Sequence, residues 1–241
     1  MDEAEEPRSL EARRTGELEE RLAGVDARIA EAARAVGRDP GELTRIVVSK
    51  FHPAELVREL HALGVRDFGE NRQQEFTAKA AEVGALHGIR WHFIGQAQTN
   101  KARSIRKAAT AVHSLDRARL ADALDAAAEG GPTLDVLLQV NLTDDADRGG
   151  VAPAEIESLA EHVAGCDTLA LRGVMGVAPL DEPAPAAFER LRGYADRVRS
   201  IVPQATWISA GMTADFADAI AFGATHLRIG SAITGPRPAR G

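Results

Sequence analysis

Short apolar runs alternate with longer amphipathic segments along most of this 241-residue chain. Apolar runs of this length that are rich in β-branched side chains are typical of buried strands. Strands that alternate with helices pair in parallel, and eight repeats favour a closed (β/α)8 TIM barrel of the α/β class over an open sheet. The runs are RIVVSK (45–50), VRDFGEN (65–71), RWHFIG (90–95), AVHSLD (111–116), LDVLLQVN (134–141), LALRGVMG (169–176), ATWISAG (205–211) and THLRIG (225–230).

Helix-start residues follow most of these runs and support the same reading. They are Pro53, Asn71, Thr99, Asp116, Pro153, Pro185 and Thr213. An open Rossmann-like sheet would need a glycine-rich turn after its first strand. The first run is followed by Phe51 and His52 instead, so we predict a single barrel domain over residues 13–241.

The N-terminal segment divides into a tail and a helix. Residues 1–12 are acidic and lack an apolar pattern, which predicts a disordered tail. The next residues predict an extra N-terminal helix that ends before Gly37 and Pro40. Its apolar positions have helical spacing and are Leu18, Leu22, Val25, Ile29, Ala32 and Val36.

Charge and cysteine content narrow the classes of partner. The formal net charge of −7 and the pI of about 5.6 argue against a nucleic-acid or acidic-membrane partner. A single cysteine, Cys166, excludes an intramolecular disulfide, and the histidines never occur at a paired metal-ligand spacing, so we expect no metal site. No apolar run is long enough to cross a bilayer and the first residues do not resemble a signal peptide, so we expect a cytoplasmic protein.

Lys50 closes the first apolar run, and this position can give its amine a chemical role. An amine in a desolvated pocket mouth has a lowered pKa, and its neutral form attacks carbonyls to form a Schiff base. The alternative is a lysine at a strand end that extends into water. Glu70 lies at a similar strand end, where it is expected either to pair with a cation such as Lys101 or to anchor the barrel rim.

The loops after the last two predicted strands combine glycine with a hydroxyl. They contain Ser209, Gly211, Met212 and Thr213 in one loop, and Arg228, Gly230 and Ser231 in the other. These positions are the usual phosphate cradle of barrels, although either glycine could be a simple turn residue. An amine that faces a phosphate cradle suggests a ligand with both an aldehyde and a phosphate. Pyridoxal 5'-phosphate (PLP) has both groups.

Several motifs together resemble the YggS/PROSC family of pyridoxal-phosphate-binding homeostasis proteins, which share the barrel of the alanine racemase N-terminal domain. The resemblance covers residue 15 to the C-terminus. The motifs are VVSK, FGEN, WHFIG, SLD, QVN, GVMG, SAGMTADF and HLRIGSAITGPR. The family usually has Ser-Met-Gly-Met-Ser at residues 209–213, but Thr213 keeps the last hydroxyl.

The resemblance implies a role for each matching residue. Lys50 matches the lysine that carries PLP as a Schiff base, and Asn71 matches an asparagine near the cofactor ring. Ser209 and Thr213 match hydroxyls of the phosphate site, which the loop at Gly211 and Met212 together with Gly230 and Ser231 completes. Arg228 matches the arginine at the pyridine nitrogen. Arginine can only donate hydrogen bonds, so it keeps that nitrogen unprotonated and makes the ring a weaker electron sink.

The resemblance also implies a function in intracellular PLP (vitamin B6) homeostasis without substantial catalysis. PLP is the expected partner, with PLP-dependent apo-enzymes as recipients and a monomer as the default state. A PLP-dependent amino-acid racemase is the alternative, but in related racemases the second base is a tyrosine of a second domain. The only tyrosine here, Tyr194, has core spacing on a predicted helix. A Schiff-base aldolase is less favoured, because its lysine typically lies on a later strand.

Overall fold

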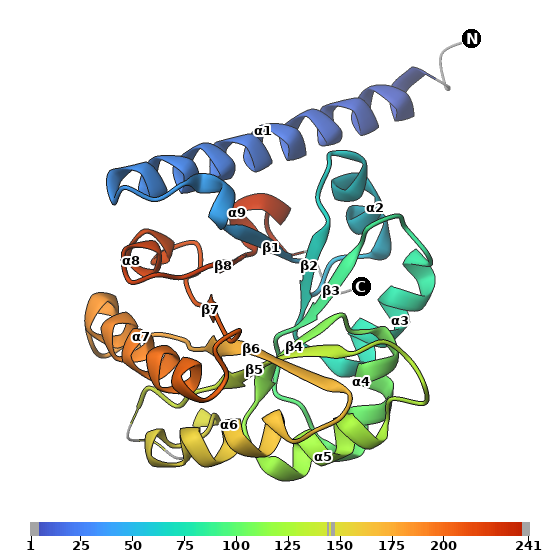
Figure 1. The fold of residues 1–241 in the computed structure, drawn as a ribbon. Coiled ribbons are helices and arrows are strands. Elements are labelled where there is room, and N and C mark those ends of the chain that lie inside the picture. The colour runs from blue at the N-terminus through green and yellow to red at the C-terminus, as the bar shows by residue number, and fades with distance from the viewer. Residues whose placement is uncertain (1–4, 144, 146–147, 238–241) are drawn as a thin grey trace.

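The computed structural model describes residues 5–143, 145 and 148–237. Its centre is a closed barrel of parallel strands in the order β1 to β8, which confirms the predicted (β/α)8 architecture (Figure 1). Each strand lies within the apolar run that predicted it, apart from the extra residue Thr44 at the start of the first. The strands are β1 Thr44–Val48, β2 Asp67–Glu70, β3 Arg90–Phe93, β4 Ala111–Leu115, β5 Leu134–Gln139, β6 Leu169–Met175, β7 Trp207–Ser209 and β8 His226–Ile229.

Helices follow the strands and form the outer layer of the barrel (Figure 1). They are α1 Glu5–Ala35, α2 Ala54–Ala62, α3 Gln73–Val83, α4 Ala102–Ala108, α5 Ala118–Ala126, α6 Ile156–Ala164, α7 Ala184–Ile201, α8 Phe216–Ala221 and α9 Ser231–Thr234. Short 3-10 helices lie at η1 Pro40–Glu42, η2 Thr99–Lys101 and η4 Pro153–Glu155. Within the described residues, no helix is both long and apolar enough to cross a membrane.

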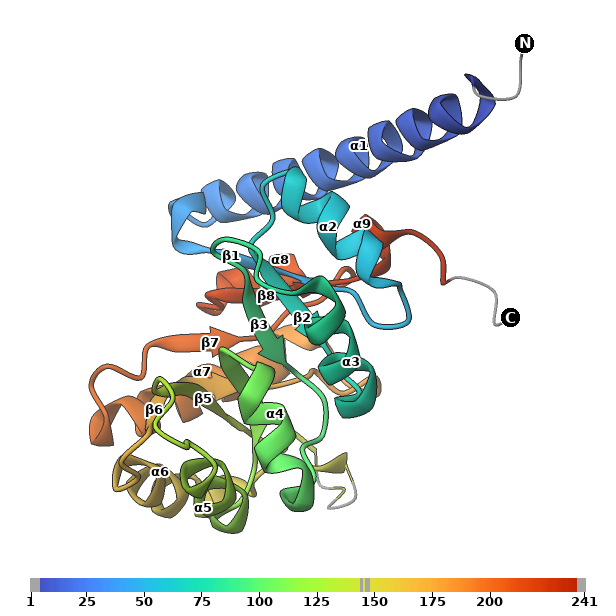
Figure 2. The same ribbon diagram turned by 90° about the vertical axis from the view of Figure 1, so that its right-hand side faces the viewer.

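Helix α1 is the extra N-terminal helix, and it packs against α8 and α9. Its buried face comprises Leu18, Leu22, Val25, Ile29 and Ala33, and the expected Ala32 is partly buried against the same hydrophobic cluster. The helix begins at Glu5, so residues 5–12 are helical where a disordered tail was expected. These residues include several with high helix propensity, such as glutamate, leucine and alanine, so they extend the amphipathic helix although they lack an apolar pattern of their own. The start of α1 extends past the barrel (Figure 2); residues 1–4 lie outside the described residues.

Two buried layers result from the alternation of side chains along each strand. Outward residues pack with the helices in one continuous hydrophobic cluster, which includes Val47, Phe68 and Phe93. The barrel interior holds fewer apolar side chains, such as Ile46 and Val48, which a Cβ at Gly69 would touch. The remaining interior positions are largely polar, which sets this barrel apart from the branched aliphatic layers usual for the fold.

The strand register brings the C-terminal ends of β1, β2 and β8 together. Val48 pairs with Gly69 of β2, and Val47 pairs with Ile229 of β8. Lys50 lies two residues beyond β1, and Asn71 and Gly230 directly follow β2 and β8, so all three lie at one rim of the barrel. This is the rim at which barrel active sites form.

Candidate functional site

Lys50 lies two residues beyond the inward-facing Val48, so the alternation of the strand directs its side chain to the mouth of the barrel. The side chain is half-buried. Its Nζ lies 5.9 Å from the centre of the Phe51 ring. Among the described residues, Lys50 has no hydrogen-bond or ion-pair partner. The amine is therefore held at the rim without a competing carboxylate.

The peptide groups on both sides of Lys50 are fixed by side chains of α3. Lys79 Nζ donates a hydrogen bond to the carbonyl oxygen of Ser49 over 2.8 Å. On the other side, the Phe51 N–H donates to the Glu75 carboxylate. Phe51 has a φ of +69°, a left-handed conformation that costs a side-chain-bearing residue energy. These contacts fix the backbone of the loop that presents Lys50.

A buried ion pair anchors this loop to β2. Lys79 Nζ lies 2.5 Å from Glu70 Oε1, which also accepts the Ser49 hydroxyl over 2.7 Å. Burial raises the pKa of Glu70, and the nearby Lys79 ammonium and Ser49 hydroxyl oppose that rise. The cation beside Glu70 is thus Lys79 and not Lys101. Lys79 was not predicted from the sequence, although its spacing of four residues from Glu75 on a helix was a usable signal.

Arg228 lies buried inside the barrel below the same rim. Its Nη1 donates to Ser209 Oγ over 2.8 Å, and its Nη2 donates to the carbonyl oxygen of Gly176 over 2.9 Å. Burial lowers the pKa of Arg228 to about 10, and the negative charge of Asp215 opposes that shift. The guanidinium therefore keeps its charge at neutral pH and is held from two sides.

The position of Ser209 differs from the expected phosphate site. It pairs with His226, the first residue of β8, and is fully buried. Its hydroxyl lies 2.8 Å from both Arg228 Nη1 and His113 Nδ1. The register therefore places this hydroxyl inside the barrel, where it supports Arg228.

The loop after β7 turns at Gly211, where only glycine fits. Gly211 has a φ of +89°, and a Cβ there would lie 2.8 Å from Ala219 Cβ. The Met212 N–H donates to Asp215 Oδ1 over 2.6 Å, and the Met212 side chain is exposed. Thr213 follows in a half-buried position. This turn brings the loop to the same rim as Lys50.

The loop after β8 leaves open space at Gly230, next to the end of β1. A Cβ at Gly230 would meet nothing closer than Val48, 3.8 Å away. Ser231 follows as the exposed first residue of α9. Asn71 is also exposed, and a Cβ at Gly95 would overlap its carbonyl oxygen, so the neighbouring loop fixes its backbone. The room above Gly230 and the hydroxyls around it fit a phosphate-bearing ligand.

Tyr194 packs in the outer helical layer, apart from these rim residues. It is half-buried on α7 against the hydrophobic cluster, with the Arg197 guanidinium carbon 5.5 Å from its ring centre. This confirms the expected packed helix residue. Tyr194 also borders a cavity of about 920 Å³ between the loops that follow β5 and β6.

The fold and the site place this protein among the (β/α)8 barrels that carry a lysine just beyond the first strand. The family described as "Alanine racemase, N-terminal domain" matches residues 25–238. The pyridoxal phosphate homeostasis protein of Pseudomonas aeruginosa is 44% identical over 91% of this chain and 96% of its own length. The pyridoxal phosphate homeostasis protein of Mycobacterium tuberculosis is 40% identical over 94% of this chain and 95% of its own length. The chain therefore belongs to the alanine racemase N-terminal domain family and, within it, to the pyridoxal phosphate homeostasis proteins.

Solved structures agree with this assignment. PipY of Synechococcus elongatus without PLP has a TM-score of 0.81 and 35% identity, covering 90% of this chain and 100% of PipY. The structure of PipY with PLP bound has a TM-score of 0.80 at the same identity and coverage. Alanine racemase of Corynebacterium glutamicum has a TM-score of 0.67 and 15% identity, and the match covers 90% of this chain and 61% of the racemase chain. At this identity the likeness shows the fold alone.

Proposed function

We propose that this protein binds PLP at the rim formed by β1, β7 and β8 and serves PLP homeostasis. When bound, PLP supplies an aldehyde that forms a Schiff base with Lys50. The observation that carries the proposal is the half-buried Lys50, whose amine has no hydrogen-bond or ion-pair partner among the described residues and whose two flanking peptide groups are fixed by α3. The homeostasis proteins named above and PipY with PLP bound support it.

The remaining site residues are assigned by position. Thr213, Ser231 and the backbone at Gly211, Met212 and Gly230 would hold the phosphate, because backbone N–H groups and hydroxyls at loop-to-helix junctions bind anions. Asn71 would border the ring from the end of β2. Arg228 would donate to the pyridine nitrogen, with Ser209 supporting the guanidinium from below.

We also propose that the protein carries PLP without substantial turnover of substrate. A charged donor at the pyridine nitrogen disfavours protonation of the ring, and an unprotonated ring stabilises carbanions poorly. PLP-dependent apo-enzymes are the proposed recipients, and a cytoplasmic monomer remains our expectation. An amino-acid racemase would need a second base opposite Lys50, and Tyr194 packs against the helical layer instead.

An absorption titration with PLP, followed by borohydride and peptide mapping, tests the cofactor site. A racemase assay on the same PLP-loaded sample separates the two functions. We expect a Lys50 adduct, and we expect alanine to racemise no faster than with free PLP. Racemisation of alanine that is lost in Tyr194→Phe would overturn the carrier proposal and favour the racemase.

A further inference from the structure

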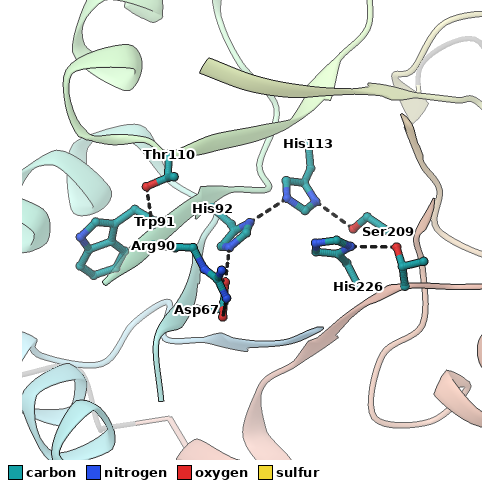
Figure 3. Close-up of polar contacts among 9 residues, drawn as sticks. Asp67, Arg90, Trp91, His92, Thr110, His113, Ser209 and His226 are labelled. Atoms are coloured by element: carbon teal, nitrogen blue, oxygen red, sulfur yellow. Dashed lines mark hydrogen bonds and ion pairs between the residues drawn. The ribbon is translucent and has the colours of Figure 1, made fainter. Parts of the chain in front are cut away.

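A hydrogen-bonded chain of side chains crosses the interior of the barrel (Figure 3). It starts at Asp67, the first residue of β2, whose Oδ1 lies 2.9 Å from His92 Nε2. His92 Nδ1 lies 2.9 Å from His113 Nε2, and His113 Nδ1 lies 2.8 Å from Ser209 Oγ. Ser209 Oγ in turn accepts from Arg228. We call Asp67, His92, His113 and Ser209 the interior relay.

The relay is almost completely shielded from solvent. His113 and Ser209 are fully buried, and His92 is 2% exposed. The His92 and His113 rings meet edge-on, with 5.1 Å between their centres, and His226 lies 6.3 Å and 6.2 Å from them. Buried polar groups destabilise a fold unless each is hydrogen-bonded, so loss of any one residue of the interior relay leaves its neighbours without a hydrogen-bond partner.

One end of the relay is anchored at the N-terminal mouth of the barrel, opposite the proposed cofactor site. Arg90 binds Asp67 through Nε over 2.7 Å and Nη2 over 2.5 Å. Burial opposes ionisation of Asp67, but hydrogen bonds from His92 and Arg90 lower its pKa to about 2. Asp67, Arg90 and His92 border a cavity of about 370 Å³ that is lined by the first residues of several strands. The carboxylate is therefore ionised and can only accept hydrogen bonds.

With both rings neutral, the two ends fix the direction of every hydrogen bond between them. Asp67 accepts, so His92 Nε2 donates, and a neutral His92 ring must accept at Nδ1. His113 Nε2 then donates to His92, which leaves His113 Nδ1 to accept from the Ser209 hydroxyl. Arg228 can only donate, and it donates to a lone pair of Ser209 Oγ. Burial lowers the pKa of His113 well below its usual value, in agreement with a neutral ring.

We propose that the interior relay positions Arg228: the anchored carboxylate of Asp67 fixes both histidines as Nε2–H tautomers and so presents Ser209 Oγ as an acceptor that holds the guanidinium toward the cofactor site. Its effect on PLP rests on the proposed function, but the tautomers are a property of the free protein. Asp67, His92 and His113 are thus positioning residues for a group at the opposite mouth of the barrel.

Nitrogen-15 NMR of histidine-labelled protein without PLP tests the tautomers directly. At pH 8 we expect His92 and His113 to carry their proton on Nε2, with assignment by His92→Gln and His113→Gln. An Nδ1–H tautomer or an imidazolium at either ring would overturn the proposal. Because no cofactor is present, this result does not depend on PLP binding.

Asp67→Asn tests the positioning role. An amide can donate or accept, so it no longer forces His92 Nε2 to donate, and we expect the Nδ1–H form of His92 to appear. On the PLP-loaded protein we expect a shifted cofactor absorption band and about fivefold faster PLP release, the effect of one weakened hydrogen bond. An altered tautomer with an unchanged band and release rate would overturn the positioning role.

Asp135→Asn is the matched control. Asp135 binds Arg172 Nε over 2.6 Å and borders the same cavity, but it forms no hydrogen bond or ion pair with the relay residues. We expect this variant to keep both tautomers, the cofactor band and the release rate. Equal changes in the two aspartate variants would contradict the relay, because they would reflect general loosening of the N-terminal mouth. If PLP binds neither the parent nor the variants, the proposed function fails while the NMR result still decides the tautomers.

Discussion

Lys79 donates a hydrogen bond from Nζ to the carbonyl oxygen of Ser49 over 2.8 Å, directly before Lys50 in the chain. The same ammonium lies 2.5 Å from the fully buried Glu70. One lysine of α3 therefore fixes the backbone that presents another lysine at the rim.

We predict that Lys79→Met destabilises the fold by about 3–5 kcal/mol at pH 8, because it leaves Glu70 buried without its cation. Urea unfolding measures this loss. The double variant Lys79→Met with Glu70→Gln should recover part of the stability, since the uncompensated charge is gone. If the double variant is no more stable than Lys79→Met, the ion pair is not the reason for the loss.

The stability of Lys79→Met should also depend on pH in a defined direction. Burial raises the pKa of Glu70, and removal of Lys79 raises it further. A carboxyl whose folded pKa is raised contributes stability at pH values below its unfolded pKa, and this stability is lost as the pH rises through the folded pKa. Lys79→Met should therefore lose less stability at pH 5 than at pH 8, relative to the parent at each pH. A pH-independent loss would contradict a charged Glu70 as its cause.

The buried histidines predict acid sensitivity of the whole fold. Burial and the neighbouring His92 lower the pKa of His226 from 6.5 to about 3, and burial also lowers that of His113. The unfolded chain gains these protons below pH 6.5, while folded His226 gains its proton only near pH 3. Stability should fall as the pH drops through this window, by about 2 kcal/mol at pH 5 for His226 alone. Urea unfolding from pH 8 to pH 5 measures it.

The control for this pH dependence is the exposed His87. His87→Gln should keep the full slope, whereas His226→Asn should reduce it if the variant folds. An unchanged slope in folded His226→Asn would show that His226 is not responsible.

Two glycines of the proposed phosphate site should respond differently to alanine. Gly211→Ala should cost ~3 kcal/mol of stability or more, because the positive φ and the contact 2.8 Å from Ala219 Cβ both oppose a side chain. Gly230→Ala should fold normally but bind PLP more weakly, since its Cβ enters the open space above Val48. Thermal unfolding and PLP titration separate the two effects.

Gly37→Ala is the control for Gly211. Gly37 also has a positive φ of +73°, but a Cβ there meets nothing within 4 Å. We expect a loss of about 1 kcal/mol from the backbone conformation alone. An equal loss at Gly37 and Gly211 would mean that the close packing at Gly211 has no effect.

The strands and the rim could be predicted from sequence because each apolar run is short and ends in a polar or glycine residue. Parallel pairing then places those ends at one rim whatever the exact register, which is why Lys50, Asn71 and Gly230 could be placed at the same rim. The position of Ser209 depends on the register of β7, and no local pattern sets that register. Its hydroxyl was therefore assigned to the rim when it lies inside the barrel.

The polar interior was missed for a related reason. His92, His113 and His226 each lie in a short strand that mixes apolar and polar residues, and a single histidine there is compatible with either face. Only the closed barrel shows that all three face inward and that two of them connect Asp67 with Ser209. Lys79 was missed because its partner, Glu70, belongs to a different element.

The most direct test of the central claim is borohydride reduction of the PLP-loaded protein followed by mass spectrometry of its peptides. The other lysines are Lys79, which is 5% exposed and ion-paired, and Lys101 and Lys107 near and within α4. We predict one stoichiometric adduct on Lys50 and its loss in Lys50→Met. A stoichiometric adduct on another lysine of the parent, or no adduct at all, would contradict the assignment of Lys50.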